Sequence, residues 1–436
     1  MISGLVDRQV FNMKTCLEAL KVNKSLWVLF ISLTFSCTKT PANPANLTVE
    51  NDVKDIPYVL LISIDGYRWD YTDKYSPPFI STFKNKGVSL KSLRPSFPTK
   101  TFPNHLSIVT GRYPMNHGIV GNKFYNPELK SFYSIRDSEA VANNEFYHSL
   151  PIWGLAEKQG LKTAPYFWPG SASAIQGITP SYNQKYKHNT PHNKRLKTVE
   201  EWFKMPKEVR PHLVTLYFHD VDSAGHGHGP DSSKVRNAIT KVDQSIEKLF
   251  NNLEKLNLPI NIIITSDHGM AALDSDKAET ILKTPDHKKL LAEFTIIGNG
   301  ALIHLYKKKN VSISDTIVLL NSSADHFKCY TPPTTPKKLN YRNNASIGDI
   351  VCLANKGWSI SANVPRVSKG GHGWSQYDGM DMHGIFYAQG PNFKKNLQIE
   401  TQDNVNIYPL IAHILNLKIE HEIDGNLENM QALLNE

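Results

Sequence analysis

Short apolar runs alternate with amphipathic stretches along most of the chain from residue 58 onward. The clearest runs have the length of a strand, and they lack the polar alternation of a strand with one face in water. These runs are Tyr58–Ile64, Leu213–Phe218, Ile260–Thr265 and Gly384–Ala388. Their pattern predicts strands that are buried on both faces, as in a parallel sheet.

The stretch Ser232–Leu256 has a different pattern, because its apolar residues recur at the spacing of a helix. A Pro-Asp-Ser sequence at its beginning is a helix start signal. Strands alternating with helices predict an α/β fold, with a mostly parallel central sheet flanked by helices on both faces. The segment from about Ala271 to Lys369 is less regular and richer in Lys, Asn and Pro. We expect it to form an inserted irregular lobe that shapes the site.

The N-terminal region has the pattern of an export signal. Lys21 and Lys24 precede the apolar run Leu26–Leu33, which is too short to cross a bilayer as a mature helix. The run is followed by Thr-Phe-Ser and Cys37, a sequence that resembles a bacterial lipobox. We therefore expect Cys37 to be the lipidated first residue of the mature protein.

These features divide the chain into a lipoprotein-type signal peptide (1–36), a tether (37–56) and a folded domain (57–436). The tether is rich in Pro, Asn and Thr and has no apolar periodicity, as a flexible linker does. The predicted location is the bacterial periplasm or outer membrane, with membrane contact only through the lipid anchor. A monomer is expected.

Charge and cysteine content add little to this picture. The formal net charge is +9, but the Lys-rich stretches are short and scattered. A solubilising surface is therefore favoured over a groove for polyanions, and no stable nucleic-acid partner is expected. Cys329 and Cys352 are the only cysteines after Cys37. They either form a disulfide in an oxidising compartment or remain as two buried thiols.

Two motifs at the ends of predicted strands bear carboxylates. Asp65 follows the first strand, and the glycine after it lets the chain turn away. Asp267 and His268 follow Ile260–Thr265, and Gly269 allows the sharp turn that would bring both side chains to one ion. Open α/β sheets bind their ligands at this edge. Taken singly, a strand-end aspartate is as often a helix cap as a ligand.

Two further motifs supply histidines. Asp222 and His226 follow Leu213–Phe218, and Gly225 permits a turn that would bring both to one metal. His372 lies between glycines on a predicted loop, which alone is equally consistent with a mobile turn. Together with the strand-end carboxylates, these residues mix oxygen and nitrogen ligands. That mixture is typical of zinc.

A hydroxyl completes the set. Thr101 lies in the segment Pro98–His105, just before the helix-like stretch Leu106–Thr110. The N-terminus of a helix favours negative charge through its amide groups and dipole, so this hydroxyl is a candidate nucleophile toward phosphorus. The alternative is a simple N-cap.

In this order, the motifs resemble those of the nucleotide pyrophosphatase/phosphodiesterase family of the alkaline phosphatase superfamily. The resemblance extends from about Ile56 to the C-terminus. It includes the segments His117–Asn122, Phe167–Ser171 and Arg210–His212. It implies an alkaline-phosphatase-like fold.

The resemblance also implies roles for individual residues. One zinc ion would be bound by Asp222, His226 and His372, and the second by Asp65, Asp267, His268 and the nucleophile Thr101. Asn122 would contact a phosphate oxygen, and Phe102 and Tyr186 would sandwich a nucleotide base. The chain departs from the family pattern at Gly373–Asp378 and at His219–Val221.

The implied function is that of a two-zinc enzyme with a small-molecule substrate. It would hydrolyse nucleotide phosphodiester or pyrophosphate bonds through a phospho-threonine intermediate. A phosphonate hydrolase of the phosphonoacetate type and a lipid- or choline-phosphate phosphodiesterase remain open, as does a surface lipoprotein without catalysis. A sulfatase is disfavoured, because Thr101 stands where that class needs Cys or Ser.

Overall fold

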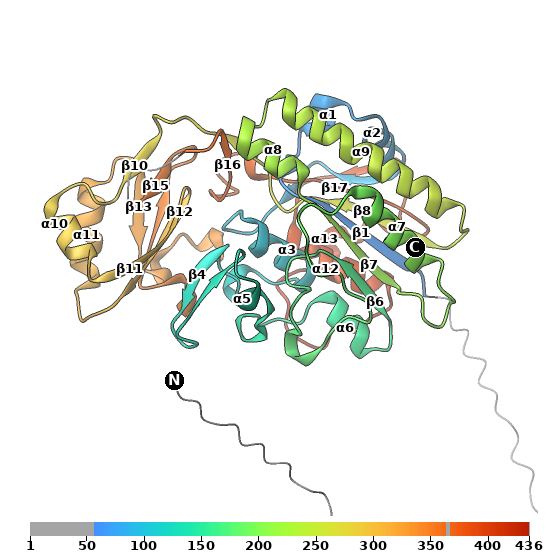
Figure 1. Ribbon diagram of the computed structural model, residues 1–436, viewed down its shortest axis with the longest axis horizontal. Helices are drawn as coiled ribbons and strands as arrows, with labels where there is room; N and C mark the ends of the chain where they lie inside the picture. The colour runs from blue at the N-terminus through green and yellow to red at the C-terminus, as the bar shows by residue number, and fades with distance from the viewer. Residues whose placement is uncertain (1–55, 363–366, 436) are drawn as a thin grey trace, which may run out of the picture. The chain divides into compact units, whose positions relative to one another are not determined.

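A seven-stranded sheet forms the centre of the computed structural model, which describes residues 56–362 and 367–435 (Figure 1). Its strand order is β18 (Leu397–Ile399), β2 (Val88–Leu90), β17 (Phe386–Gln389), β8 (Ile260–Thr265), β1 (Tyr58–Ile64), β7 (Leu213–Phe218) and β6 (Thr163–Tyr166). The strands from β8 to β6 are parallel, whereas β17 is antiparallel to both of its neighbours. The prediction of a mostly parallel central sheet is confirmed.

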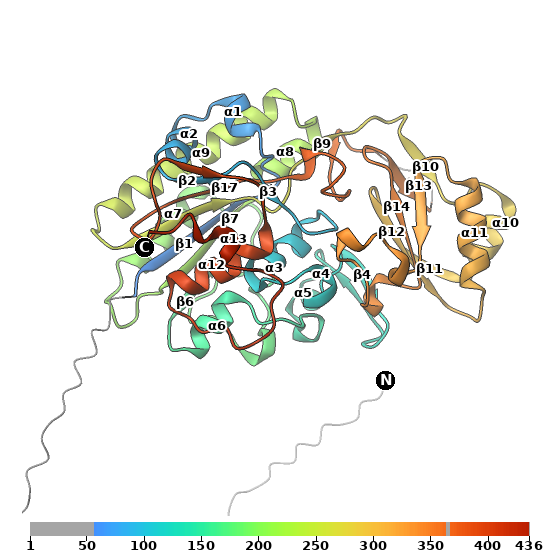
Figure 2. The same ribbon diagram turned by 180° about the vertical axis from the view of Figure 1, so that it is seen from behind.

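Helices cover both faces of this sheet (Figures 1 and 2). One face carries α1 (Tyr71–Tyr75), α2 (Pro78–Lys86), α7 (His192–Phe203), α8 (Asp220–His228) and α9 (Ser233–Glu254); the other carries α3 (Thr101–Thr110), α6 (Ile152–Lys158) and α12 (Ile407–Ile414). Successive residues of β1 alternate between the two hydrophobic cores, with Leu60 in one and Leu61 in the other. Both faces are therefore buried, which explains why the strand is apolar throughout.

The sequence predicted these elements closely. Three of the predicted strands coincide with β1, β7 and β8, and the fourth is displaced toward the C-terminus as β17. The predicted long helix is α9, and the Ser232 hydroxyl caps it by accepting from the Val235 N–H. None of the helices within the described residues is long and apolar enough to cross a membrane.

The segment from about Ala271 to Lys369, which was expected to be irregular, is a folded lobe with its own sheet. Its antiparallel sheet has the order β11 (Phe294–Asn299), β12 (Leu302–Lys307), β14 (Ile350–Ala354) and β13 (Phe327–Tyr330). Alongside lie α10 (Pro285–Leu291), α11 (Ile313–Ser323) and the parallel pair β10 (Ala278–Thr280) and β15 (Ser359–Ser361). The lobe has its own hydrophobic core, so the expectation of irregularity is wrong.

A disulfide joins Cys329 and Cys352, which lie opposite each other on β13 and β14. This resolves the alternative that the sequence left open. The signal peptide, the anchor cysteine and nearly all of the tether lie outside the described residues.

Short elements connect these layers. The strands are β3 (Leu93–Arg94), β4 (Lys123–Asn126), β5 (Ser131–Ser134), β9 (Ala271–Ala272), β16 (Gly370–Gly371) and β19 (Gln402–Asp403). The helices are α4 (Pro114–His117), α5 (Ser138–Ala142) and α13 (Glu428–Gln431), with 3-10 turns at Asn144–Phe146, Ile175–Gly177, Pro332–Thr334, Lys337–Leu339, Ala345–Ile347, Met380–Met382 and Asn404–Asn406. Among them, the β9–β16 pair brings the segment around residue 372 next to the chain that leaves β8.

Candidate functional site

The first group of metal-binding side chains lies where β1 and β8 end. These strands are neighbours in parallel register, so the residues that follow them meet at one edge. Nε2 of His268 lies 3.4 Å from Oδ1 of Asp65 and 3.1 Å from Oδ2 of Asp267. Gly66 has a φ of +68°, and a side chain there would come within 2.9 Å of the backbone of Asp222. The turn after β1 therefore requires glycine.

The second group combines α8 with the loop after β16. Oδ1 of Asp222 lies 3.4 Å from Nε2 of His226 and 3.6 Å from Nε2 of His372, and the two imidazole nitrogens are 3.1 Å apart. The expected turn at Gly225 is wrong, because Asp222 and His226 lie one turn apart on a helix. That spacing places both side chains on one face.

The two groups adjoin. The rings of His268 and His372 stack with their centroids 3.6 Å apart. Ligand atoms of Asp65, Asp267 and His268 lie within 4.8 Å of one another, and so do those of Asp222, His268 and His372. His268 therefore stands between two sets of ligand atoms.

Burial and neighbouring charges shift the pKa values of these side chains in different directions. Burial, together with the nearby Asp267 and Asp222, raises the pKa of Asp65 well above its usual value. Burial opposes ionisation of Asp267 as well, but His268 and His105 hold the pKa of this carboxyl well below its usual range. Burial and the neighbouring positive groups lower the pKa of His372. Neutral imidazole is the form that binds a metal ion.

Three carboxylate oxygens in these groups are buried without a hydrogen-bond partner among the described residues. They are Oδ1 of Asp65, Oδ1 of Asp222 and Oδ2 of Asp267, each of which faces an imidazole nitrogen. A buried carboxylate oxygen without a partner is unfavourable, and three in one place require a common partner. A pair of divalent cations fits this donor set, and its mixed oxygen and nitrogen atoms suit zinc.

Thr101 is the first residue of α3, and its Oγ1 lies 3.3 Å from Nε2 of His268. Lys100 occupies the N-cap position, so the reading of Thr101 as a simple N-cap does not apply. Asn122 lies beside it and accepts the Phe102 N–H through Oδ1 at 3.1 Å. Because that oxygen is occupied, the amide NH₂ is the end of Asn122 that remains for a ligand.

Phe102 and Tyr186, the two residues expected to sandwich a base, pack on different neighbours. The ring of Phe102 contacts Tyr133 at 6.4 Å. Tyr186 is 50% exposed; its ring contacts Phe167 and Tyr217, and its hydroxyl lies 2.9 Å from Nδ1 of His188. Since Tyr217 itself contacts Asp65, Tyr186 lies one side chain away from the metal groups.

Sequence reasoning missed three residues of the site. The Tyr217 hydroxyl donates to Oδ2 of Asp65 at 2.6 Å, and His105 lies 3.3 Å from Oδ2 of Asp267. Burial lowers the pKa of Lys100 to about 8, and the Asp222 carboxylate partly offsets this effect. In the sequence, Tyr217 is one residue of an apolar strand and Lys100 is one charged residue among many, so neither pattern indicated a role in the site. His105 follows Thr101 by one helical turn, which could have placed it on the same face.

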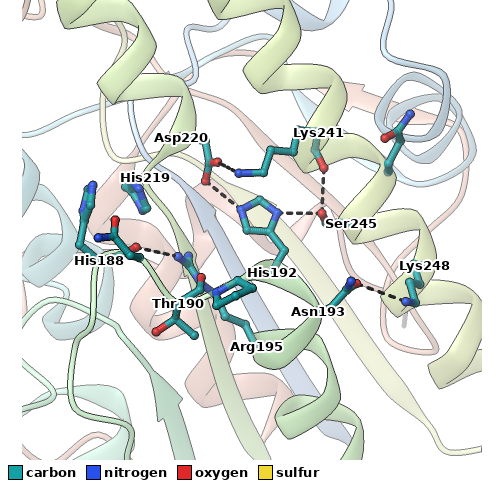
Figure 3. Close-up of a pocket in the computed structure, with 13 residues that line it drawn as sticks. His188, Thr190, His192, Asn193, Arg195, His219, Asp220, Lys241, Ser245 and Lys248 are labelled. Atoms are coloured by element: carbon teal, nitrogen blue, oxygen red, sulfur yellow. Dashed lines mark hydrogen bonds and ion pairs between the residues drawn. The ribbon is translucent and has the colours of Figure 1, made fainter.

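A hollow of about 620 Å³ lies beside these groups, between the start of α7 and the helices α8 and α9 (Figure 3). Its side chains pair with one another: His192 contacts both Asp220 and Ser245, and Lys241 also contacts Asp220. The buried Arg195 donates to the carbonyl oxygen of Tyr217. The hollow contains none of the candidate metal ligands, and its internal pairs join the start of α7 to α8 and α9.

Residues 59–384 match the family model described as type I phosphodiesterase/nucleotide pyrophosphatase. The chain is 36% identical over 375 residues to human ectonucleotide pyrophosphatase/phosphodiesterase family member 1, covering 83% of this chain but only 40% of that protein. It is 32% identical over 384 residues to a bis(5′-adenosyl)-triphosphatase of Xenopus laevis, covering 87% of this chain and 82% of that protein.

The solved structures of murine ectonucleotide pyrophosphatase/phosphodiesterase 5 are also similar. One matches with a TM-score of 0.80 and 30% identity over 87% of this chain and 100% of that chain. A second, of an inactive variant in complex with AMP, matches with a TM-score of 0.81 and 29% identity over the same shares. The prediction of an alkaline-phosphatase-like fold is confirmed.

Proposed function

The chain belongs to the type I phosphodiesterase/nucleotide pyrophosphatase family, and on that premise we propose that it is a two-zinc hydrolase of nucleotide phosphodiester or pyrophosphate bonds. The observation that carries this proposal is the position of Thr101. Its hydroxyl is 3.3 Å from His268, at the start of a helix and next to three unpartnered carboxylate oxygens.

The proposed ligand sets follow the two groups of side chains. Asp222, His226 and His372 would hold one zinc ion; Asp65, Asp267, His268 and Thr101 would hold the other. The bound ions supply Lewis-acid chemistry, since they lower the pKa of a hydroxyl and stabilise charge on attacking and leaving oxygens.

The residues of the chain then perform a double displacement. The Thr101 oxygen forms a bond to phosphorus, the bond from phosphorus to the leaving oxygen breaks, and the hydroxyl proton passes to solvent. Water next attacks the phospho-threonine, which restores the Thr101 hydroxyl and releases a monoester. Throughout, the N-terminus of α3 favours the negative charge, and the Asn122 amide donates to a non-bridging oxygen.

The substrate class rests on two supports. Phe102 is a partly buried ring next to Thr101, and Tyr186 is an exposed ring that contacts Tyr217, the partner of Asp65; rings of this kind stack on a nucleotide base. The Xenopus relative is named as a bis(5′-adenosyl)-triphosphatase, and the murine neighbour was solved in complex with AMP. Both favour a nucleotide over a phosphonate or a choline ester.

We also propose that residues 57–436 form the catalytic domain of an exported, monomeric enzyme. The disulfide between Cys329 and Cys352 supports an oxidising compartment. The leader at residues 1–36 and the anchor at Cys37 remain predictions from the sequence alone, as does the assignment to the bacterial periplasm or outer membrane.

The test is a set of assays on the zinc-loaded full chain. Substrates are the nitrophenyl ester of a nucleoside monophosphate, nitrophenyl phosphorylcholine, nitrophenyl phosphate and phosphonoacetate. We expect the nucleotide ester to be preferred, and Thr101→Ala to lower its turnover by about a thousandfold or more. Thr82→Ala, an exposed threonine on α2, serves as the matched control. Activity that survives Thr101→Ala contradicts the nucleophile, whereas preference for phosphorylcholine or phosphonoacetate contradicts only the substrate.

A further inference from the structure

His219 belongs to the segment where the chain departs from the family pattern, and the proposed mechanism does not use it. Its ring packs on the ring of His188, with the centroids 3.9 Å apart and the planes tilted by 37° (Figure 3). Burial lowers the pKa of His219 to about 4, so the ring is uncharged at neutral pH. Its Nδ1 is buried without a hydrogen-bond partner among the described residues. An uncharged ring in this position provides a packing surface for His188.

His188 connects this surface to Tyr186, the ring expected to stack on a base. Nδ1 of His188 lies 2.9 Å from the Tyr186 hydroxyl, which is the distance of a hydrogen bond. His219 occupies the N-cap position of α8. His188 therefore links the beginning of α8 to the side chain of Tyr186.

The backbone at His188 is held by Arg195, a buried residue of α7. The guanidinium group donates from Nη2 to the His188 carbonyl at 3.3 Å and from Nε to the Thr190 carbonyl at 3.1 Å. A third bond, from Nη1 to the Tyr217 carbonyl at 2.9 Å, joins the same group to β7. The backbone that carries the His188 side chain is thereby fixed relative to the central sheet.

Tyr186 needs such support because of where it lies. It belongs to the connection between β6 and α7, outside any helix or strand, and its side chain is half exposed. Exposed side chains exchange rapidly between rotamers. The rings of Phe167 and Tyr217 contact the Tyr186 ring, and His188 holds its hydroxyl. These contacts restrict the ring before a ligand arrives, which lowers the entropy cost of binding.

We propose that His188, supported by His219, is a positioning residue that fixes the Tyr186 ring for stacking on the base of a nucleotide substrate. The inference rests on the proposed function, in which Tyr186 contacts the base. It gives a role to two histidines that bind neither of the proposed zinc ions. The base is remote from the reacting phosphorus and is bound equally in the ground state and the transition state. Loss of this positioning should therefore appear in KM and not in kcat.

The experiment measures kcat and KM for the nitrophenyl esters of thymidine monophosphate and of methyl phosphate, using the zinc-loaded full chain. The two esters share a leaving group, but the methyl ester has no base. We expect His188→Ala to raise KM for the thymidine ester by about three- to tenfold, with kcat and the KM for the methyl ester changed by less than about twofold. His188→Asn, which places an amide where Nδ1 stands, should recover most of the loss. His413→Ala, at an exposed histidine on α12, is the matched control.

A double-mutant cycle separates positioning from direct contact with the substrate. Tyr186→Phe removes the hydroxyl but keeps the ring, so it should raise KM for the thymidine ester by about the same factor as His188→Ala. Adding His188→Ala to Tyr186→Phe should then have no further effect. His219→Ala removes the packing surface and should raise the same KM by about two- to fivefold.

Four results overturn the inference: a further rise of KM in the double variant, an equal rise on both esters, no rise with His188→Ala, or no recovery with His188→Asn. An unchanged KM in His219→Ala overturns the role of His219. Zinc content and thermal unfolding, measured on each variant, show whether the metal groups and the fold persist.

A wild-type protein that hydrolyses neither ester defeats the proposed function instead. In that case, nitrogen-15 spectra of the histidines, recorded without substrate, still test the contact itself. The Nδ1 signal of His188, identified by its loss in His188→Ala, should shift in Tyr186→Phe because the hydrogen bond is removed. An unchanged signal would mean that His188 does not hold Tyr186.

Discussion

At the scale of single residues, the candidate metal ligands depend on neighbours that bind no metal. Tyr217 is the clearest example, because its hydroxyl holds Oδ2 of Asp65 while Oδ1 stays free toward His268. The hydrogen bond thus selects which carboxylate oxygen faces the site. It also counteracts the effect of burial, which disfavours the charged form of Asp65.

Tyr217→Phe should therefore weaken zinc binding without unfolding the protein. We expect the affinity for zinc to fall by about 10- to 100-fold, the usual effect of removing a side chain that orients a ligand. Competition with a chromogenic chelator measures this. Tyr71→Phe is the matched control, because the Tyr71 hydroxyl is buried with no hydrogen-bond partner among the described residues. Equal zinc affinities for the two variants would show that Tyr217 does not orient Asp65.

At the scale of elements, α8 provides two ligands through its packing. The helix contains Gly225 and Gly227, which have opposite surroundings. A Cβ on Gly225 would lie 2.8 Å from Cε of the fully buried Met270, whereas one on Gly227 would have nothing within 4 Å. Gly225 therefore allows the helix to approach the chain that follows β8, while Gly227 has no such role.

Alanine at these two positions should have opposite effects. Gly225→Ala is expected to cost about 1–3 kcal/mol of unfolding free energy by overpacking and to lower zinc affinity, because His226 moves with the helix. Gly227→Ala should stabilise the protein by up to about 1 kcal/mol, as alanine is the better helix former. Urea unfolding of both variants measures the difference. Destabilisation by Gly227→Ala, or none by Gly225→Ala, would contradict this account of α8.

The same helix shows how far the sequence alone predicts this protein. Strands such as β1 can be predicted from the sequence because both of their faces are buried and the strand is apolar throughout. The residues that follow these strands could be grouped because ligands bind at the carboxyl ends of parallel strands. Gly225 was interpreted as a turn, because glycine signals a turn and close packing equally well. The contact with Met270 depends on tertiary structure. The role of Tyr217 was missing for the same reason, since it depends on the register between β1 and β7.

At the scale of the whole molecule, the site belongs to the central sheet and not to the lobe. All the proposed ligands lie outside residues 278–361, which hold the lobe's strands and its disulfide. The lobe adjoins the site at its border, where Ala301 and Lys100 both lie next to Gly373. The lobe has a separate core of short antiparallel strands with polar edges. Such strands give a weaker sequence pattern than parallel strands buried on both faces, which is why the segment was expected to be irregular.

The stability of the whole fold toward acid should depend on His117. This buried residue accepts the Ile119 N–H through Nδ1 and donates through Nε2 to the Pro103 carbonyl, so it must be neutral. Burial lowers its pKa to about 3, against about 6.5 in the unfolded chain.

Between these values the unfolded state binds the extra proton, so the contribution of His117 is complete above pH 6.5 and is lost as the pH falls toward 3. At pH 5 the expected loss is about 2 kcal/mol relative to pH 7.5. His117→Gln keeps a donor and an acceptor but cannot titrate, and it should therefore lose about 2 kcal/mol less over this range. Urea unfolding at the two pH values measures this difference. Release of a bound metal ion by acid would affect both proteins alike, so equal losses of unfolding free energy in wild type and variant would mean that His117 does not determine the stability of the fold in acid.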